Sequence, residues 1–128
     1  MKTIIFIICI CLVQQLMAQR GLYPIKVKVD GTTTTLYSES HALIIGVSDY
    51  TGGWPKLPGV KKDVTAVKAA LEQNGFNVEV AQNISIDEMD ATFRDFIKKY
   101  GQKTNNRLVF YFAGHGHTIK TAYGEVID

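Results

Sequence analysis

The chain has 128 residues, of which 46% are apolar and 20% charged, a composition typical of one folded domain and unlike that of disordered or collagen-like chains. Its formal charge is +2, from 14 Lys and Arg against 12 Asp and Glu, which is too small an excess to indicate nucleic-acid or acidic-membrane binding. The only two cysteines, Cys9 and Cys11, lie in an apolar N-terminal run.

The N-terminus has the pattern of an export signal. Lys2 precedes the apolar run 4–13, and Ala18 supplies a small residue at the cut site. A membrane-spanning helix needs about 20 apolar residues, roughly twice this run. We therefore expect residues 1–18 to be a signal peptide and the mature protein to be periplasmic or extracellular, with no membrane attachment. Cleavage of the signal peptide removes both cysteines. The mature residues 19–128 therefore have no disulfide, no cysteine-zinc site and no cysteine nucleophile of their own.

The extension 19–39 and the residues after it predict strands. In 22–37, Ile and Val alternate with Lys until Asp30-Gly31 and a run of Thr, which predicts a peripheral hairpin. Residues 41–47 are continuously apolar, which is typical of a strand covered on both faces.

Two helices and two further strands follow in alternation. Apolar residues recur at helical spacing from Val60 to Leu71, and Asn74-Gly75 ends that helix. Residues 76–81 predict the second strand. A capping box at 85–88 opens a second helix that stops at Gly101, and the apolar third strand, 107–113, leads into Gly-His-Gly-His.

Alternation of strands and helices predicts an α/β fold with a mostly parallel sheet, helices on both faces, and the first core strand in the centre. Such sheets place their sites at the carboxyl ends of the strands, where the winding reverses. Three segments converge there: the loop 48–59, the helix start near Val60 and the turn 114–117.

His115, flanked by Gly114 and Gly116, is the principal candidate for chemistry. Its imidazole can act as a general base near neutral pH, and the Gly116 N–H can face a developing oxyanion. Two alternatives stay open: a loop histidine with only local hydrogen bonds, or a metal site that pairs His115 with His117. No third His and no nearby Asp/Glu cluster follows these two, and His41 begins the first core strand at the opposite end of the sheet.

Asp63 is expected in the first turn of the first helix, where the helix dipole favours a carboxylate. From its position alone, Asp63 is interpreted as a structural charge at the helix N-terminus. Ser48 ends the first core strand, but no G-x-S-x-G motif surrounds it, so a serine nucleophile is not expected. Tyr50 and Trp54 are expected to cover the core.

Three segments together resemble the first half of the caspase-like cysteine peptidases, and the bacterial and metacaspase-type members most. They are HALIIGVSDY (41–50), LPGVKKDVTAVKAAL (57–71) and RLVFYFAGHGH (107–117). The resemblance covers about residues 40–128 and implies a three-layer caspase-like sandwich, of which this chain holds the first three core strands and an N-terminal hairpin.

By resemblance, His115 matches the catalytic histidine, Gly116 the oxyanion-hole glycine, and Asp63 an acidic residue in the pocket for a basic side chain. The nucleophilic cysteine would lie beyond Asp128, so we expect domain 40–128 to be incomplete and this chain alone to be inactive. The apolar third strand would then be an unpaired edge, and the tail 122–128 the opening of further sheet or hairpin.

The function expected is that of a cysteine endopeptidase that cleaves after basic residues and acts on peptides or proteins. The resemblance implies no resident cofactor and leaves calcium dependence and oligomeric state open. The alternatives are a non-catalytic caspase-like interaction domain and, less favoured, a metal-dependent hydrolase that uses His115 and His117.

Overall fold

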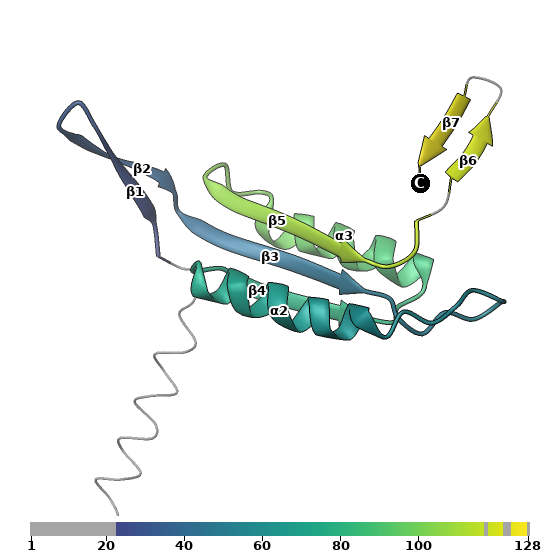
Figure 1. Ribbon diagram of the computed structural model, residues 1–128. Coiled ribbons are helices and arrows are strands. Elements are labelled where there is room, and N and C mark those ends of the chain that lie inside the picture. The colour runs from purple at the N-terminus through teal and green to yellow at the C-terminus, as the bar shows by residue number, and fades with distance from the viewer. Residues whose placement is uncertain (1–22, 117, 122–123, 128) are drawn as a thin grey trace, which may run out of the picture.

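The central sheet has three parallel strands. The computed structural model describes residues 23–116, 118–121 and 124–127. β3 (Glu39–Gly46) lies between β4 (Asn77–Gln82) and β5 (Asn106–Ala113), as Figure 1 shows. Gly46 is level with Gln82 on one side and with Ala113 on the other, so the three carboxyl ends form one edge. The predicted order, with the first core strand central, is confirmed.

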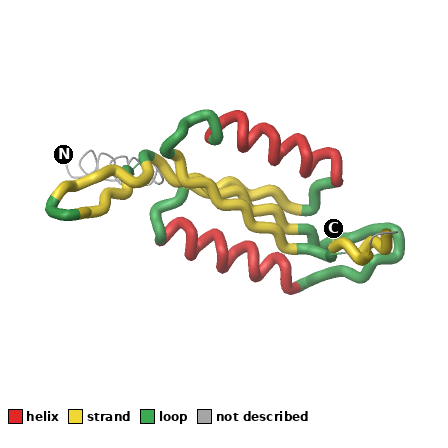
Figure 2. Tube along the Cα trace, turned by 90° about the horizontal axis from the view of Figure 1, so that it is seen from above, coloured by secondary structure: helices red, strands yellow, loops and turns green. Residues whose placement is uncertain are grey.

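Helices cover the two faces of this sheet. α2 (Gly59–Gln73) and α3 (Ile86–Tyr100) lie on opposite sides of it (Figure 2), which gives the predicted three layers. β3 is buried on both faces because successive side chains of a strand point to opposite sides. Ile44 packs with residues of α2, and Leu43 and Ile45 pack with residues of α3; the buried partners are Val60, Val64 and Phe96. Full burial stabilises by about 1.5–3 kcal/mol per large apolar side chain.

The predicted capping box of α3 is present. Ser85 Oγ accepts a hydrogen bond from the Glu88 N–H at 3.3 Å, and the Glu88 carboxylate accepts one from the Ser85 N–H at 2.8 Å. These bonds from the Ser85 backbone and hydroxyl hold the pKa of Glu88 below its usual value. The start of α3 is thereby fixed close to the carboxyl end of β4.

Two antiparallel hairpins flank the sheet in sequence. β1 (Ile25–Val29) and β2 (Thr32–Tyr37) form the predicted N-terminal ribbon, which projects away from the sheet in Figure 1. Asp30 and Gly31 make its turn with φ angles of 48° and 83°. β6 (Thr118–Thr121) pairs with β7 (Gly124–Ile127), so the tail does enter a hairpin.

In the part of the chain that the structure describes, no helix is long and apolar enough to cross a membrane. The expected signal peptide lies outside the described residues.

Candidate active site

A glycine with no room for a side chain begins the turn after β5. A Cβ on Gly114 would lie 2.5 Å from the Tyr50 hydroxyl and 2.6 Å from the Phe112 ring. Real Cβ atoms do not approach other atoms so closely. The close packing of Tyr50 therefore requires glycine at 114 and brings the loop 48–58 against the turn that carries His115.

This loop holds His115 at three points. The His115 N–H donates to the Tyr50 hydroxyl at 2.7 Å, and ring atom Nε2 lies 2.8 Å from the Pro55 carbonyl oxygen. The rings of Tyr50 and Trp54 lie 4.6 and 5.1 Å from the His115 ring, centre to centre. Tyr50 and Trp54, expected to cover the core, thus pack on the candidate base.

The Pro55 contact determines which ring nitrogen is basic. A carbonyl oxygen only accepts hydrogen bonds, so Nε2 must carry the hydrogen. In the neutral ring the other nitrogen, Nδ1, is then the proton acceptor. His115 is half-buried, so its ring is held in place by the protein and still reachable. This combination suits a general base.

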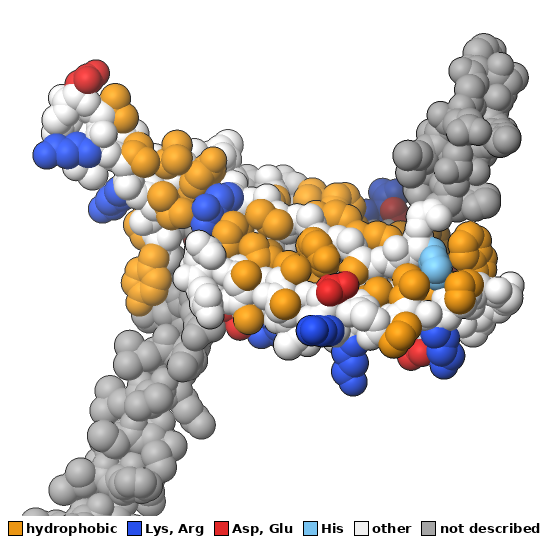
Figure 3. Space-filling model, in the orientation of Figure 1, with side chains coloured by type: hydrophobic (Ala, Val, Ile, Leu, Met, Phe, Trp, Pro, Cys, Tyr) orange, Lys and Arg blue, Asp and Glu red, His pale blue; other side chains and the backbone are white. Residues whose placement is uncertain are grey.

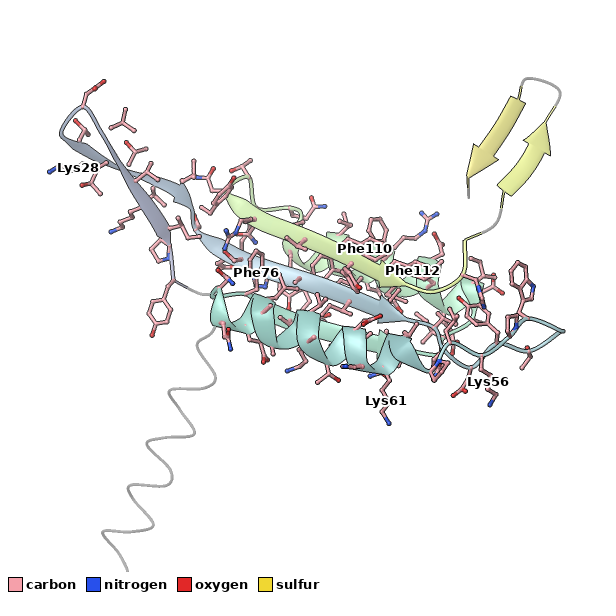
Figure 4. All side chains as sticks on the ribbon, in the orientation of Figure 1. Lys28, Lys56, Lys61, Phe76, Phe110 and Phe112 are labelled. Atoms are coloured by element: carbon pink, nitrogen blue, oxygen red, sulfur yellow. The ribbon has the colours of Figure 1, made fainter. Side chains whose placement is uncertain are left out.

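A cavity of about 650 Å³ opens beside His115. Its wall is mostly apolar and comes from β5, the end of β3 and the start of α3: Val47, Ile84, Ile86, Met89, Phe110 and Phe112. Its polar groups are the Tyr50 hydroxyl, Ser85 and His115, with the backbone of Gly114 and Gly116. Figure 3 shows hydrophobic side chains around a surface histidine at this end, and Figure 4 labels Phe110 and Phe112 on β5.

Gly116 is exposed and lines the same cavity, one residue after His115. The fold thus brings His115 and Gly116 to one wall. Acyl transfer requires a base such as an imidazole and a donor to the oxyanion beside a nucleophile, and His115 supplies an imidazole at this wall.

The expected place of Asp63 in the first turn of its helix is wrong. α2 begins at Gly59, after Pro58, so Asp63 is its fifth residue and no acidic residue occupies the first turn. The influence of the helix dipole fades beyond the first turn, so this carboxylate is not explained as a helix-terminus charge. Asp63 is exposed and does not line the cavity at His115.

His41 has a structural environment at the other end of the sheet, as expected from its position. It is buried, its ring stacks on Tyr100 at 3.8 Å, and Nε2 lies 2.9 Å from the Glu39 carboxylate. Hydrogen bonds from Lys103 and His41 hold the pKa of Glu39 below its usual value. The sequence indicated the location of His41 but not this cluster.

Within residues 23–116 and the two short described segments after them, no three His, Cys, Asp or Glu gather as a metal site would require. His117, the second residue of the metal hypothesis, lies outside the described residues. The two serines at this edge are occupied, since Ser48 Oγ donates to Asn83 and Ser85 Oγ belongs to the capping box. Neither hydroxyl is paired with His115.

Two residues of this site carry no sequence signal. Pro55 acts through its backbone carbonyl, which every residue possesses. Asn83 follows β4, adopts a φ of 53°, and accepts hydrogen bonds from Ser48 and Asp49. Its only advance indication was that β4 also ends at the edge where the site was expected.

Residues 39–128 match the family model of the caspase domain. Neither the curated proteins nor the solved structures include a match to the chain.

Proposed function

Because the chain belongs to the caspase-domain family, we propose that it is the histidine-bearing part of a cysteine endopeptidase that works outside the cytoplasm. The observation that carries the proposal is His115, half-buried, with Nε2 tied to the Pro55 carbonyl and Gly116 beside it. This geometry supports a base and an oxyanion donor on one cavity wall.

In this proposal Nδ1 of His115 takes the proton of a cysteine thiol. The thiolate attacks the peptide carbonyl carbon, and the Gly116 N–H stabilises the oxyanion that forms. His115 then gives the proton to the leaving amine, a thioester remains, and water hydrolyses it. Peptides or proteins are the substrates, as the peptidase family suggests.

The thiol comes from polypeptide outside residues 19–128 that adds a strand beside β5. The exposed side chains of Phe110 and Phe112 on β5 support this, since 46% and 40% of their surface is exposed. Large apolar side chains along an unpaired edge are the surface that an added strand covers.

Purified mature chain, residues 19–128, should not cleave peptides because it holds no thiol. The natural protein that carries the cysteine should cleave them. His115→Ala should lower kcat about 10²–10⁴-fold there, as expected for loss of a general base, whereas His117→Ala should cost much less. Equal losses from the two substitutions, restored by added zinc, would favour the metal-dependent hydrolase, and a natural protein without a cysteine at this edge would favour the interaction domain.

A preference for Arg or Lys before the cut bond is the finer part of the proposal. Asp63 supports it as an exposed carboxylate on the second turn of α2, the helix that starts at the site edge. A charge-assisted hydrogen bond contributes about 1.5–3 kcal/mol, so Asp63→Ala should reduce discrimination between Arg and Ala substrates by about tenfold or more. Because Asp63 is not at the helix terminus, the stability of the protein should hardly change. A wild-type preference for Asp substrates would contradict the assignment.

A further inference from the structure

The loop that holds His115 is itself held at its base by one side chain. Asn83 Oδ1 accepts hydrogen bonds from the Ser48 N–H at 2.8 Å, the Ser48 hydroxyl at 3.1 Å and the Asp49 N–H at 3.0 Å. The Leu57 N–H donates to the Ser48 carbonyl at 2.9 Å, which closes the loop on the same residue. We define these contacts of Asn83 with Ser48 and Asp49 as the clasp.

The two residues whose hydrogen bonds hold His115 each lie two positions from one end of the Leu57–Ser48 hydrogen bond. Tyr50 follows Ser48 by two positions, and Pro55 precedes Leu57 by two. Between them the loop turns through two glycines with positive φ and carries mostly exposed side chains. The tip of the loop is mostly exposed, and the clasp holds the base from which Tyr50 and Pro55 extend to His115.

The backbone of Asn83 is also specialised. Its φ of 53° is a left-handed conformation that asparagine tolerates better than most residues. Its N–H donates to the Gly46 carbonyl at the end of β3, which directs the amide side chain at the first loop residues. An ion pair between Lys56 and Asp49 also crosses the loop base, but both partners are largely exposed, so it contributes little.

We propose that Asn83 is a positioning residue for His115, acting through the loop 48–58. It does not touch the reacting atoms. Its amide oxygen places the loop so that Tyr50 holds the His115 backbone and Pro55 holds Nε2. The effect of Asn83 on peptide cleavage rests on the proposed function, whereas its effect on the position of the His115 ring does not depend on that function.

The chain offers two readouts that need no peptidase activity. The His115 amide is protected from hydrogen exchange by its bond to Tyr50, and exchange can be followed by mass spectrometry at micromolar concentration. Trp54 is the only tryptophan of the sequence, and its ring centre lies 5.1 Å from that of His115, so its emission should report whether the loop stays packed on the imidazole.

Asn83→Gly removes the clasp and permits the positive φ. It should speed exchange at the His115 amide about tenfold or more, because the loop loses the acceptor that orders it, and it should shift the emission of Trp54. Asn83→Asp keeps an acceptor oxygen but loses the amide N–H that donates to the Asp49 carboxylate at 3.4 Å and sets two carboxylates together, so it should restore both signals only in part. Asn74→Gly removes an amide that bonds the Ala70 carbonyl at the far end of α2, and should change neither.

Unchanged exchange and emission in a folded Asn83→Gly protein would overturn the proposal, as would equal changes in Asn74→Gly. If Asn83→Gly does not fold, Ser48→Ala removes one bond of the clasp, and the same signals must then move in the same direction, though less. In an active peptidase, Asn83→Gly should lower kcat with little change in KM. Altered signals without any peptidase activity in the natural protein would refute the proposed function and leave the clasp intact.

Discussion

At the scale of single residues, the site depends on one close approach. The Tyr50 hydroxyl fits against Gly114 and accepts the His115 N–H, so one side chain both requires a glycine and orients the next residue. The Gly-His-Gly pattern predicted a tight turn with room for a substrate. What occupies the space above Gly114 is a tyrosine from a loop more than 60 positions earlier in the chain, which spacing alone could not indicate.

Gly114→Ala should therefore destabilise the chain. The added methyl would meet the Tyr50 hydroxyl at 2.5 Å, and overpacking of this kind costs about 1–3 kcal/mol. Gly59→Ala is the matched control, because nothing lies within 4 Å of its Cβ position, at the first residue of α2. Urea unfolding should show a lower midpoint for Gly114→Ala and an equal or higher midpoint for Gly59→Ala. Equal midpoints for both variants would show that Tyr50 does not pack as described.

At the scale of elements, the start of α3 is part of the cavity wall. Ser85, Ile86 and Met89 line the cavity, so the capping box that begins this helix also fixes one side of the site. The carboxylate of Glu88 is held by the Ser85 N–H and hydroxyl, and its pKa lies below the usual 4.5. A group whose pKa is lower in the folded than in the unfolded state stabilises the protein at pH values above the unfolded-state pKa. This stabilisation is lost as the pH falls through the folded-state pKa.

Wild-type protein should accordingly exceed Glu88→Gln in melting temperature at pH 7, and the difference should shrink as the pH falls from 4.5 through the lower pKa that Glu88 has in the folded protein. The glutamine keeps an acceptor oxygen but has no charge to lose. Asp95→Asn, on the same helix but away from its N-terminus, is the control and should show no such pattern. A difference between wild type and Glu88→Gln that does not shrink as the pH is lowered would contradict the capping role.

The elements were largely predictable because local rules and packing agree. Residues 41–47 are continuously apolar, and β3 is the strand covered on both faces; Ser85 and Glu88 form the box that their spacing indicated. The start of α2 was placed too late, since Pro58 lets the helix begin at Gly59, and Asp63 moved out of the first turn as a result. The role of a backbone group such as the Pro55 carbonyl cannot be predicted from composition or periodicity, because every residue has one.

At the scale of the whole molecule, the sheet ends at β4 on one side and at β5 on the other, and no described strand pairs with the outer edge of either. Among the described residues only β3 pairs with β5. The exposed rings on β5 continue onto α3, where Phe93 packs edge-on against Phe110 at 5.2 Å and is itself 40% exposed. An apolar surface of this kind marks a place for further protein.

Export is a second prediction that concerns the whole molecule. The charged start, short apolar run and Ala18 predict removal of residues 1–18 on secretion. Mass spectrometry of protein recovered outside the cytoplasm should find Gln19 as the first residue. Replacing two apolar residues in the middle of the run with Lys should keep the protein inside the cell. A secreted protein that retains Lys2 would refute the prediction.

The outer edge of β5 predicts self-association of the mature chain. β5 presents unpaired backbone groups together with Phe110 and Phe112, and such an edge pairs with any strand that reaches it. The sedimentation coefficient of residues 19–128 should rise with protein concentration. Phe110→Lys should suppress the rise, because it puts a charge into the apolar surface of β5 and α3 that a second copy would cover. Val29→Lys, a similar change at an exposed position of the β1–β2 hairpin, should not. A wild-type chain that stays monomeric at every concentration and melts in one sharp transition would show that β5 needs no neighbouring strand, and the source proposed here for the cysteine would lose its structural support.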